Sequence, residues 1–276
     1  KEQFKILKYS IPVVKVANLN EFETSSKLKV LDVNLFFKNP FKVDKKEASK
    51  FVKKSLNYAH EIALRKSIKG VINCAINKEL LNLPNVGVTE FLASKSGIKH
   101  DSVVMLIKNK NLGVVPLTTH IDVKNISKSI NKKVIIGKIL TIHNWYLKKF
   151  KRKPKIAILG LNPHNSEFKS GSEEMRIIIP AISFLKKKGI KIKGPYASDT
   201  LFINEYKKFN IIVGMYHDQV LTPFKTLFKF DAINITLGLK YIRVSPDHGT
   251  AVPLIKKKIA NPLSLINCIN FLNNSK

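Results

Sequence analysis

Cysteine is nearly absent from this chain: its 276 residues include two, Cys74 and Cys268, which form no CxxC pattern. Two isolated cysteines exclude a disulfide scaffold and are typical of a reducing compartment, so we expect a cytoplasmic protein. Long apolar runs are also missing, because no uncharged stretch approaches the roughly 20 residues that cross a bilayer. We therefore expect no membrane segment, and the N-terminal residues, which begin with Lys rather than Met, show no signal peptide.

Acidic residues are scarce, since 19 Asp and Glu face 49 Lys and Arg, which gives a formal net charge of +30. Arginine is scarce as well, and the basic residues are almost all Lys spread over the whole chain. Nucleic-acid surfaces concentrate their basic side chains and use Arg forks for phosphates and bases. We therefore expect no nucleic-acid partner, although binding through the Lys excess stays open as an alternative. The charge should attract phosphorylated anions.

Three widespread motifs are absent, namely GxGxxG, GxxxxGK[ST] and GxSxG. The first two absences exclude the Rossmann fingerprint and the P-loop, so a nucleotide has to bind in another way. The third absence argues against a serine hydrolase.

Helical and strand-like spacings of apolar residues alternate along most of the chain. Asp44, followed three residues later by Glu47, is typical of a capping box at the start of a helix. Further helices are predicted at 126–150, at 173–188 and after Pro262. Strands are predicted at 70–76, 103–107, 114–119, 155–161, 211–216, 232–237 and 241–244. This alternation predicts an α/β fold with a largely parallel sheet.

Three histidines directly follow apolar strand runs: His120 in VVPLTTH, His164 in IAILGLNPH and His217 in IIVGMYH. Ligands of open α/β sheets bind beyond the carboxyl ends of the strands, so these imidazoles are candidates for a three-nitrogen metal site. The alternative is that each histidine caps a strand or makes a hydrogen bond in the core. Their separations match no local metal-binding motif, so the pattern alone leaves both interpretations open.

Polar and charged residues accompany these histidines. Asp199 lies at the start of a short predicted helix, and Lys225, Asn234 and Arg243 interrupt the apolar segments after His217. For most of them a solvated side chain is the simpler interpretation. Arg243 is more informative, because a chain with so few Arg has one inside the apolar run YIRVS. A buried guanidinium suits bidentate binding of phosphate or carboxylate.

The chain also contains a set of longer motifs. In chain order they are INKELL (76–81), GVTEFLA (87–93), TTH (118–120), GLNPH (160–164), EExxxIIPAI (173–182), GPYASDTLF (194–202), MYHDQ (215–219), NITLGLxxIR (234–243) and DHGTA (247–251). Together they resemble the motifs of the PdxA family of pyridoxal phosphate biosynthesis. The resemblance extends from about residue 70 to the end of the chain.

The resemblance implies an NAD-dependent oxidoreductase, with NADP as the other possible cofactor. The family's reaction is oxidation of the C3 hydroxyl of 4-phosphooxy-L-threonine, followed by decarboxylation to 3-amino-2-oxopropyl phosphate. It also implies a divalent metal (zinc, magnesium or cobalt) held by His120, His164 and His217. The family forms homodimers with a shared active site, so we expect His217 to come from the partner subunit. Within one chain it should then lie apart from His120 and His164.

The remaining site residues follow from the same resemblance. It implies that Thr89, Lys225, Asn234 and Arg243 bind the phosphorylated amino-acid substrate. It further implies catalytic roles for Asp199, close to the metal, and for Lys225.

The resemblance also implies two α/β/α lobes around a cleft, of the isocitrate and isopropylmalate dehydrogenase type. The first lobe would comprise residues 1–82 plus 256–276. The second would comprise residues 83–255 and carry the metal and substrate residues, with the metal site at the junction of the two lobes.

Three features depart from the family pattern. The expected N-terminal strand with its glycine-rich loop is missing, the turn Asn73-Cys74-Ala75 replaces T-[AG]-P, and Val88 replaces the histidine of a GHT motif. They leave two alternatives open. One is a dehydrogenase of another phosphorylated four-carbon acid, such as phospho-threonate or phospho-erythronate. The other is a non-catalytic remnant that binds metal or phosphate.

Overall fold

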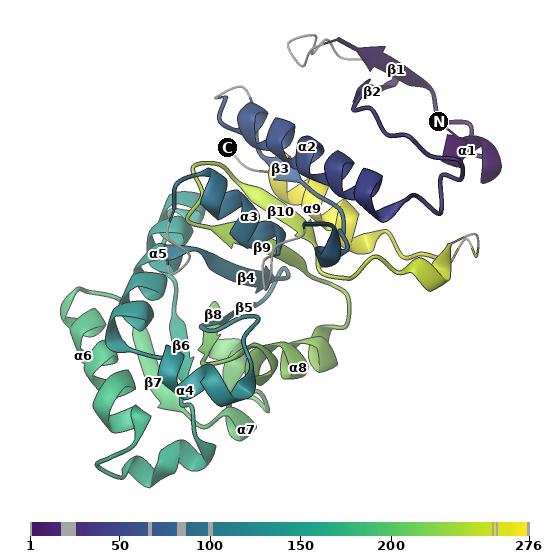
Figure 1. Cartoon of the computed structure of the whole chain (residues 1–276). Helices are drawn as coiled ribbons and strands as arrows, with labels where there is room; N and C mark the ends of the chain where they lie inside the picture. The colour runs from purple at the N-terminus through teal and green to yellow at the C-terminus, as the bar shows by residue number, and fades with distance from the viewer. Residues whose placement is uncertain are drawn as a thin grey trace.

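A mixed β-sheet forms the centre of the molecule in its computed structural model (Figure 1). The structure describes residues 2–17, 26–65, 68–81, 87–98, 102–255, 257 and 259–274. Within them the sheet has eight strands, in the order β3 (Val71–Ile72), β10 (Arg243–Pro246), β9 (Ile233–Leu237), β4 (Val104–Lys108), β5 (Gly113–Pro116), β8 (Ile211–Gly214), β6 (Ile156–Leu159) and β7 (Ile192–Tyr196).

The direction of the strands changes across the sheet. Strands β5, β8, β6 and β7 run parallel, as do β3 and β10. The three pairs between them, β10 with β9, β9 with β4 and β4 with β5, are antiparallel. The predicted α/β fold is therefore confirmed, but the prediction of a largely parallel sheet is wrong for the middle strands. The short connection between β4 and β5 allows an antiparallel hairpin there.

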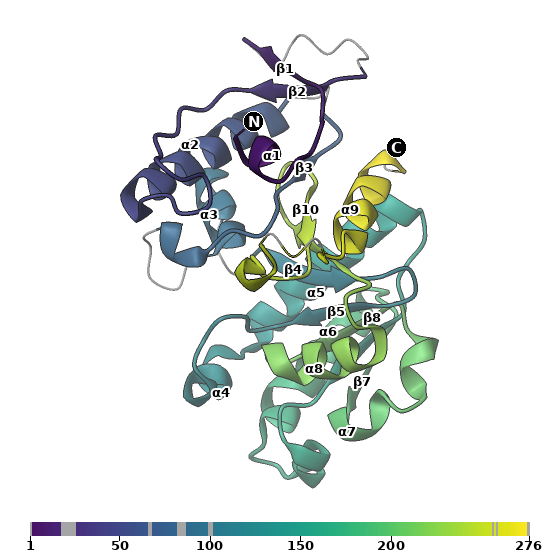
Figure 2. The ribbon, with the colours of Figure 1, turned by 90° about the vertical axis from the view of Figure 1, so that its right-hand side faces the viewer.

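Helices cover both faces of this sheet (Figure 2). Successive residues of a strand point to opposite faces, so an apolar strand presents a hydrophobic surface on each side that helices can bury. On one face, Val104 and Leu106 of β4 pack in a cluster with α5 (Lys132–Phe150), α6 (Ile179–Lys187) and α9 (Leu263–Asn273). On the other face, Met105 and Ile107 pack with α7 (Ser198–Leu201) and α8 (His217–Phe228). The result is a three-layer α/β/α arrangement.

Two of the predicted helices are interrupted. The segment predicted as a helix at 126–150 is divided into α4 (Ile126–Ser129) and α5, and Asn131 caps α5 with a hydrogen bond from Val134 N–H to its Oδ1 (3.0 Å). The segment predicted at 173–188 begins with a π-helical turn, Glu174–Ile178, before α6. Such π-helical turns are frequent at functional sites.

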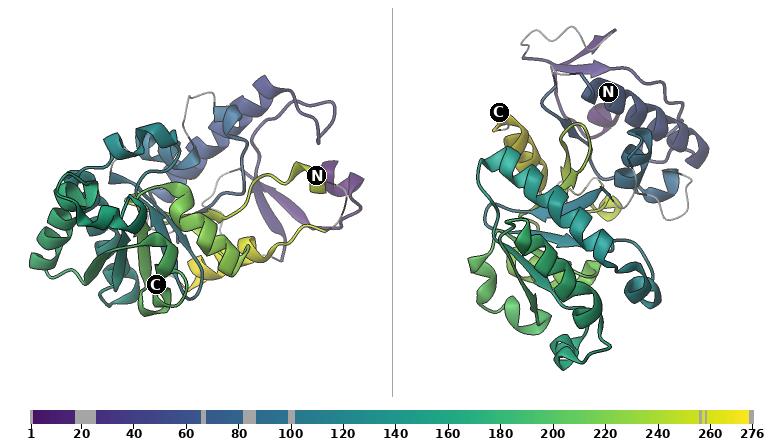
Figure 3. Two further views of the ribbon diagram at one scale, coloured as in Figure 1. Left: turned by 90° about the horizontal axis from the view of Figure 1, so that it is seen from below. Right: turned by 90° about the vertical axis from the view of Figure 1, so that its left-hand side faces the viewer.

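The N-terminal elements lie beside one end of the sheet (Figures 1 and 3). They are α1 (Glu2–Ile6), the parallel pair β1 (Val13–Val16) and β2 (Leu28–Leu31), α2 (Lys45–Ala63), the 3-10 turn η1 (Lys78–Leu81) and α3 (Val88–Lys95). The predicted cap of α2 is confirmed, because Asp44 Oδ1 accepts hydrogen bonds from the backbone N–H groups of Lys46 (2.9 Å) and Glu47 (3.1 Å).

The division into two lobes stays a prediction. The boundary residues 82, 83 and 256 lie outside the described residues. Strand β3, assigned to the first lobe, pairs with β10 of the second within one sheet. In the described part of the chain, no helix combines the length and the apolar character that a bilayer crossing requires.

Candidate active site

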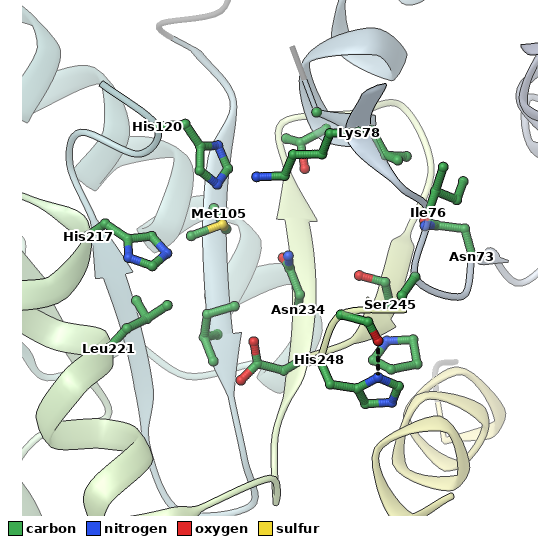
Figure 4. A pocket seen from close by; sticks show the side chains of 18 of the residues that line it. Asn73, Ile76, Lys78, Met105, His120, His217, Leu221, Asn234, Ser245 and His248 are labelled. Atoms are coloured by element: carbon green, nitrogen blue, oxygen red, sulfur yellow. Dashed lines mark hydrogen bonds between the residues drawn. The ribbon is translucent and has the colours of Figure 1, made fainter. Parts of the chain in front are cut away.

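A cavity of about 470 Å³ opens beside the carboxyl ends of β5 and β8, opposite β9 and β10 (Figure 4). Most of the predicted site residues line it, although they come from distant parts of the sequence: Thr89, His120, His217, Lys225, Asn234 and Arg243. The predicted residues His164 and Asp199 do not line it. The cavity is therefore a candidate active site that contains six of the eight predicted residues.

His120 and His217 face each other in this cavity, with ring centroids 5.9 Å apart. The expectation that His217 lies apart from His120 within one chain is therefore wrong. The reason is the strand order: β5 and β8 are parallel neighbours, so the segments that follow them meet at the same edge of the sheet. Imidazole nitrogens bind a metal at about 2.1 Å, so two rings at this spacing fit one ion between them.

Neighbouring groups prepare both imidazoles for this role. Asp218 Oδ1 lies 2.7 Å from His217 Nδ1, and a carboxylate on Nδ1 leaves Nε2 for a ligand. Burial, together with the nearby positive charge of Lys78, lowers the pKa of His120. Lys78 points from η1 into the same cavity (Figure 4). A lowered pKa favours the neutral imidazole, which is the form that binds a metal.

His164 lies outside the cavity, on an exposed turn after β6. Every residue from His164 to Phe168 has a positive φ, between 49° and 56°, although none is glycine. A left-handed backbone costs roughly 1–2 kcal/mol for each such residue, and strain of this kind is typical of functional sites. Among the described residues, no three His, Cys, Asp or Glu side chains are arranged to hold a metal ion. One chain thus supplies two imidazoles of the predicted triad.

The carboxylate of Glu174 holds the segment that leads into this turn. It is fully buried and accepts hydrogen bonds from the backbone N–H groups of Leu161 (2.8 Å) and Asn162 (2.9 Å). Burial alone raises the pKa of Glu174, but these donors outweigh it, so the pKa is lowered and the group stays ionised. Gly160 allows the side chains of Asn165 and Glu174 to lie against the backbone here, because a Cβ at this position would collide with Asn165 Oδ1 and lie 3.1 Å from Glu174 Oε1.

Arg243 is a buried cation at the opposite wall of the cavity, with 3% of its surface exposed. Its guanidinium donates hydrogen bonds to Asn73 Oδ1 (2.6 Å), Thr236 Oγ1 (3.0 Å) and Thr89 Oγ1 (3.3 Å). It forms no ion pair with any carboxylate of the described residues. Burial lowers its pKa to about 10, with nearby Glu90 opposing the shift, so the group is still charged at neutral pH. A buried charge held by neutral oxygens favours an anionic ligand.

Lys225 and Asp247 form the third polar group of the cavity. Their Nζ and Oδ2 atoms are 3.4 Å apart, and Asp247 is 9% exposed. Burial raises the pKa of Asp247, while Lys225 opposes that shift. Close to this pair, Asn234 Oδ1 is buried without a hydrogen-bond partner among the described residues. The Lys225–Asp247 pair and Asn234 thus have polar atoms available to a bound molecule.

Comparison with known proteins identifies the family of this arrangement. The family model described as pyridoxal phosphate biosynthetic protein PdxA matches residues 1–272. The chain belongs to the PdxA family.

Its relatives include the 4-hydroxythreonine-4-phosphate dehydrogenase of a Sulfurihydrogenibium species, 43% identical over 81% of this chain and 70% of the relative. The enzyme of the same name from Aquifex aeolicus is 41% identical over 76% of this chain and 66% of the relative. The crystal structure of the Klebsiella pneumoniae enzyme of that name superposes with a TM-score of 0.84 at 27% identity, over 99% of this chain and 86% of that one. The predicted family and fold are confirmed.

Sequence reasoning missed several residues of this PdxA-family pocket. Asn73, noted only as part of a departing turn, provides the shortest contact of Arg243. Asp247 and His248 were not missed as a feature, because their motif DHGTA stands out in the sequence, but neither was assigned to the site; both line the cavity. Lys78 also lines the cavity, and it lies in the motif INKELL, which could have indicated it. Asp199 is exposed on α7, away from the cavity.

Proposed function

We propose that the chain oxidises the C3 hydroxyl of 4-phosphooxy-L-threonine with NAD and releases CO2, which gives 3-amino-2-oxopropyl phosphate. The observation that carries the proposal is one cavity that contains the imidazoles of His120 and His217 and a buried Arg243, which forms no ion pair among the described residues. The names of the family's relatives support the substrate. As members of a dehydrogenase family, such chains use a nicotinamide cofactor and a metal.

The substrate brings a phosphate and a carboxylate into the cavity, and the two cationic groups can neutralise them. Arg243 has its Nε and one terminal nitrogen engaged by Asn73, Thr89 and Thr236, which fixes the direction of the rest of the fork. Lys225 contributes a second positive charge, and Asn234 offers an unpaired oxygen to the substrate's ammonium group. Fixed donors of this kind orient the substrate and reduce the entropy that its binding costs.

His120 and His217 would hold a divalent metal, and imidazole ligands suit zinc or cobalt better than magnesium. When bound, the metal acts as a Lewis acid that favours loss of hydride from C3 and then of CO2. Asp218 keeps the His217 ring oriented toward the cavity through Nδ1. The two neutral imidazoles leave the positive charge of the metal available to the substrate.

We further propose a cytoplasmic homodimer in which the third imidazole is the partner's His164. The left-handed turn from His164 to Phe168 supports this, because it leaves His164 exposed and outside its own cavity at a cost in backbone energy. This assignment exchanges the roles of His164 and His217 relative to the sequence expectation. No nucleic-acid or membrane partner is part of the proposal.

A second cavity of about 400 Å³ adjoins the first and shares Thr89, Glu90, Met105 and His120 with it. Hydride transfer requires the nicotinamide ring beside C3 of the substrate, and the two adjoining cavities provide room for both. The residues that bind the rest of the cofactor are not assigned.

The direct test is an assay of NADH formation with the purified chain, NAD and 4-phosphooxy-L-threonine. We expect NADH and CO2 in equal amounts, loss of the reaction with EDTA, and recovery with zinc or cobalt. NADH formed with phospho-threonate or phospho-erythronate but not with 4-phosphooxy-L-threonine would contradict the proposed substrate. NADH formation from none of the three would contradict the proposed activity.

A further inference from the structure

We infer that Gln219 is a positioning residue that fixes the two segments carrying His217, a ligand of this subunit's site, and His164, a ligand of the partner's site. Gln219 lies in the first turn of α8, two residues after His217. Its side chain is buried, with 8% of the residue exposed, and it does not line the cavity. The inference concerns metal binding and so rests on the proposed function.

The amide of Gln219 bridges two neighbouring strand ends. Its Oε1 accepts a hydrogen bond from the backbone N–H of Met215 (2.7 Å), which follows β8. Its Nε2 donates to the backbone C=O of Gly160 (2.7 Å), which follows β6 and precedes His164 by four residues. Both bonds are buried, so neither backbone group has water as an alternative partner. A Cβ at Gly214 would lie 2.9 Å from Gln219 Oε1, so the amide occupies space that a glycine leaves open.

The same bridge extends to the segment of His120. Thr118, two residues before His120, donates its hydroxyl to the C=O of Met215 (2.7 Å), and its N–H donates to the same oxygen (3.1 Å). The peptide groups of Met215 are therefore held from both sides, by Gln219 and by Thr118. Through this residue, the three segments that carry the predicted metal ligands form one hydrogen-bonded row along the sheet edge.

The chemistry of the amide explains why packing alone cannot replace it. A methionine of similar length would fill the space, but it would leave the N–H of Met215 and the C=O of Gly160 buried and unpaired. Those two groups would then relax apart, and the histidines that follow them would move with them. Residues that orient metal ligands without binding the metal themselves typically contribute about 10–100-fold to metal affinity.

The test compares Gln219→Met and Gln219→Glu with a matched control, Asn109→Leu. Glutamate keeps an acceptor for Met215 but loses the donor to Gly160. Asn109 is also a buried amide whose Oδ1 accepts two backbone hydrogen bonds, from Asn111 (2.9 Å) and Leu112 (2.8 Å), at the turn between β4 and β5. That turn is at the other end of β5 from Thr118.

The measurements are the zinc dissociation constant by chelator competition and the urea unfolding of the metal-free protein. We expect both Gln219 variants to bind zinc about 10–100-fold more weakly, whereas Asn109→Leu loses stability but keeps its zinc affinity. Unchanged zinc affinity in both Gln219 variants would overturn the inference, and so would an equal loss in Asn109→Leu. A wild-type chain that binds zinc but forms no NADH would contradict the proposed reaction only, and the zinc affinities of the variants would still decide the role of Gln219.

Discussion

Replacing Arg243 with alanine is expected to raise the KM for 4-phosphooxy-L-threonine by about 10–150-fold, the equivalent of a lost charge-assisted contact of about 1.5–3 kcal/mol. Bound zinc should be unchanged, because Arg243 lies on the wall opposite the imidazoles. Arg243→Lys should recover little of the loss, since an ammonium cannot reproduce the planar fork that contacts Asn73, Thr89 and Thr236. Steady-state kinetics and zinc analysis of both variants measure these effects.

Arg152→Ala is the matched control for Arg243, because it removes the same charge from an exposed site outside the cavity. Its KM should equal that of the wild type, which separates local binding from the general attraction of a +30 protein for anions. A loss of zinc rather than of substrate affinity in Arg243→Ala would contradict the role given to this residue.

Replacing His217 with alanine should abolish zinc binding at micromolar free metal and, with it, NADH formation. The imidazoles that remain in the site, His120 and the partner's His164, cannot hold the ion with comparable affinity. Asp218→Asn should weaken zinc binding by a smaller factor of about 10–100, because it removes the carboxylate from His217 Nδ1 but leaves the ring. Zinc content after dialysis and the NADH assay provide the measurements.

His143→Gln serves as the control for the loss of an imidazole, because His143 is buried on α5 and does not line the cavity. It should keep one zinc per active site. If His217→Ala bound zinc and turned over as the wild type does, the assignment of the metal site would be wrong.

Much of this architecture was predictable because it depends on local patterns. Strands such as Ile211–Gly214 are uninterrupted apolar runs, and the cap at Asp44 is defined by residues within one turn. The predicted segments around His120, His164 and His217 do end at one edge of the sheet. The three segments meet at one edge because their strands are parallel, and parallel strands are what the alternation of helices and strands predicts.

The relative placement of the histidines was not predictable, because it depends on strand order. The parallel neighbour of β5 in the sheet is β8, which is distant in sequence, so the chain alone does not reveal that His120 meets His217. The left-handed turn after Pro163 has no sequence signal, since its five residues include no glycine. The contact of Asn73 with Arg243 joins residues 170 positions apart, and no local spacing encodes it.

The central claim is that each active site combines His120 and His217 of one subunit with the partner's His164. The most direct test mixes two inactive variants, His164→Ala and His217→Ala, under conditions in which subunits exchange. A heterodimer then has one intact site, so random mixing should restore about a quarter of the wild-type rate of NADH formation. Mixing His120→Ala with His217→Ala should restore nothing, because every site of that heterodimer lacks one ligand. Recovery in the second mixture, or none in the first although heterodimers form, would contradict the shared site described here.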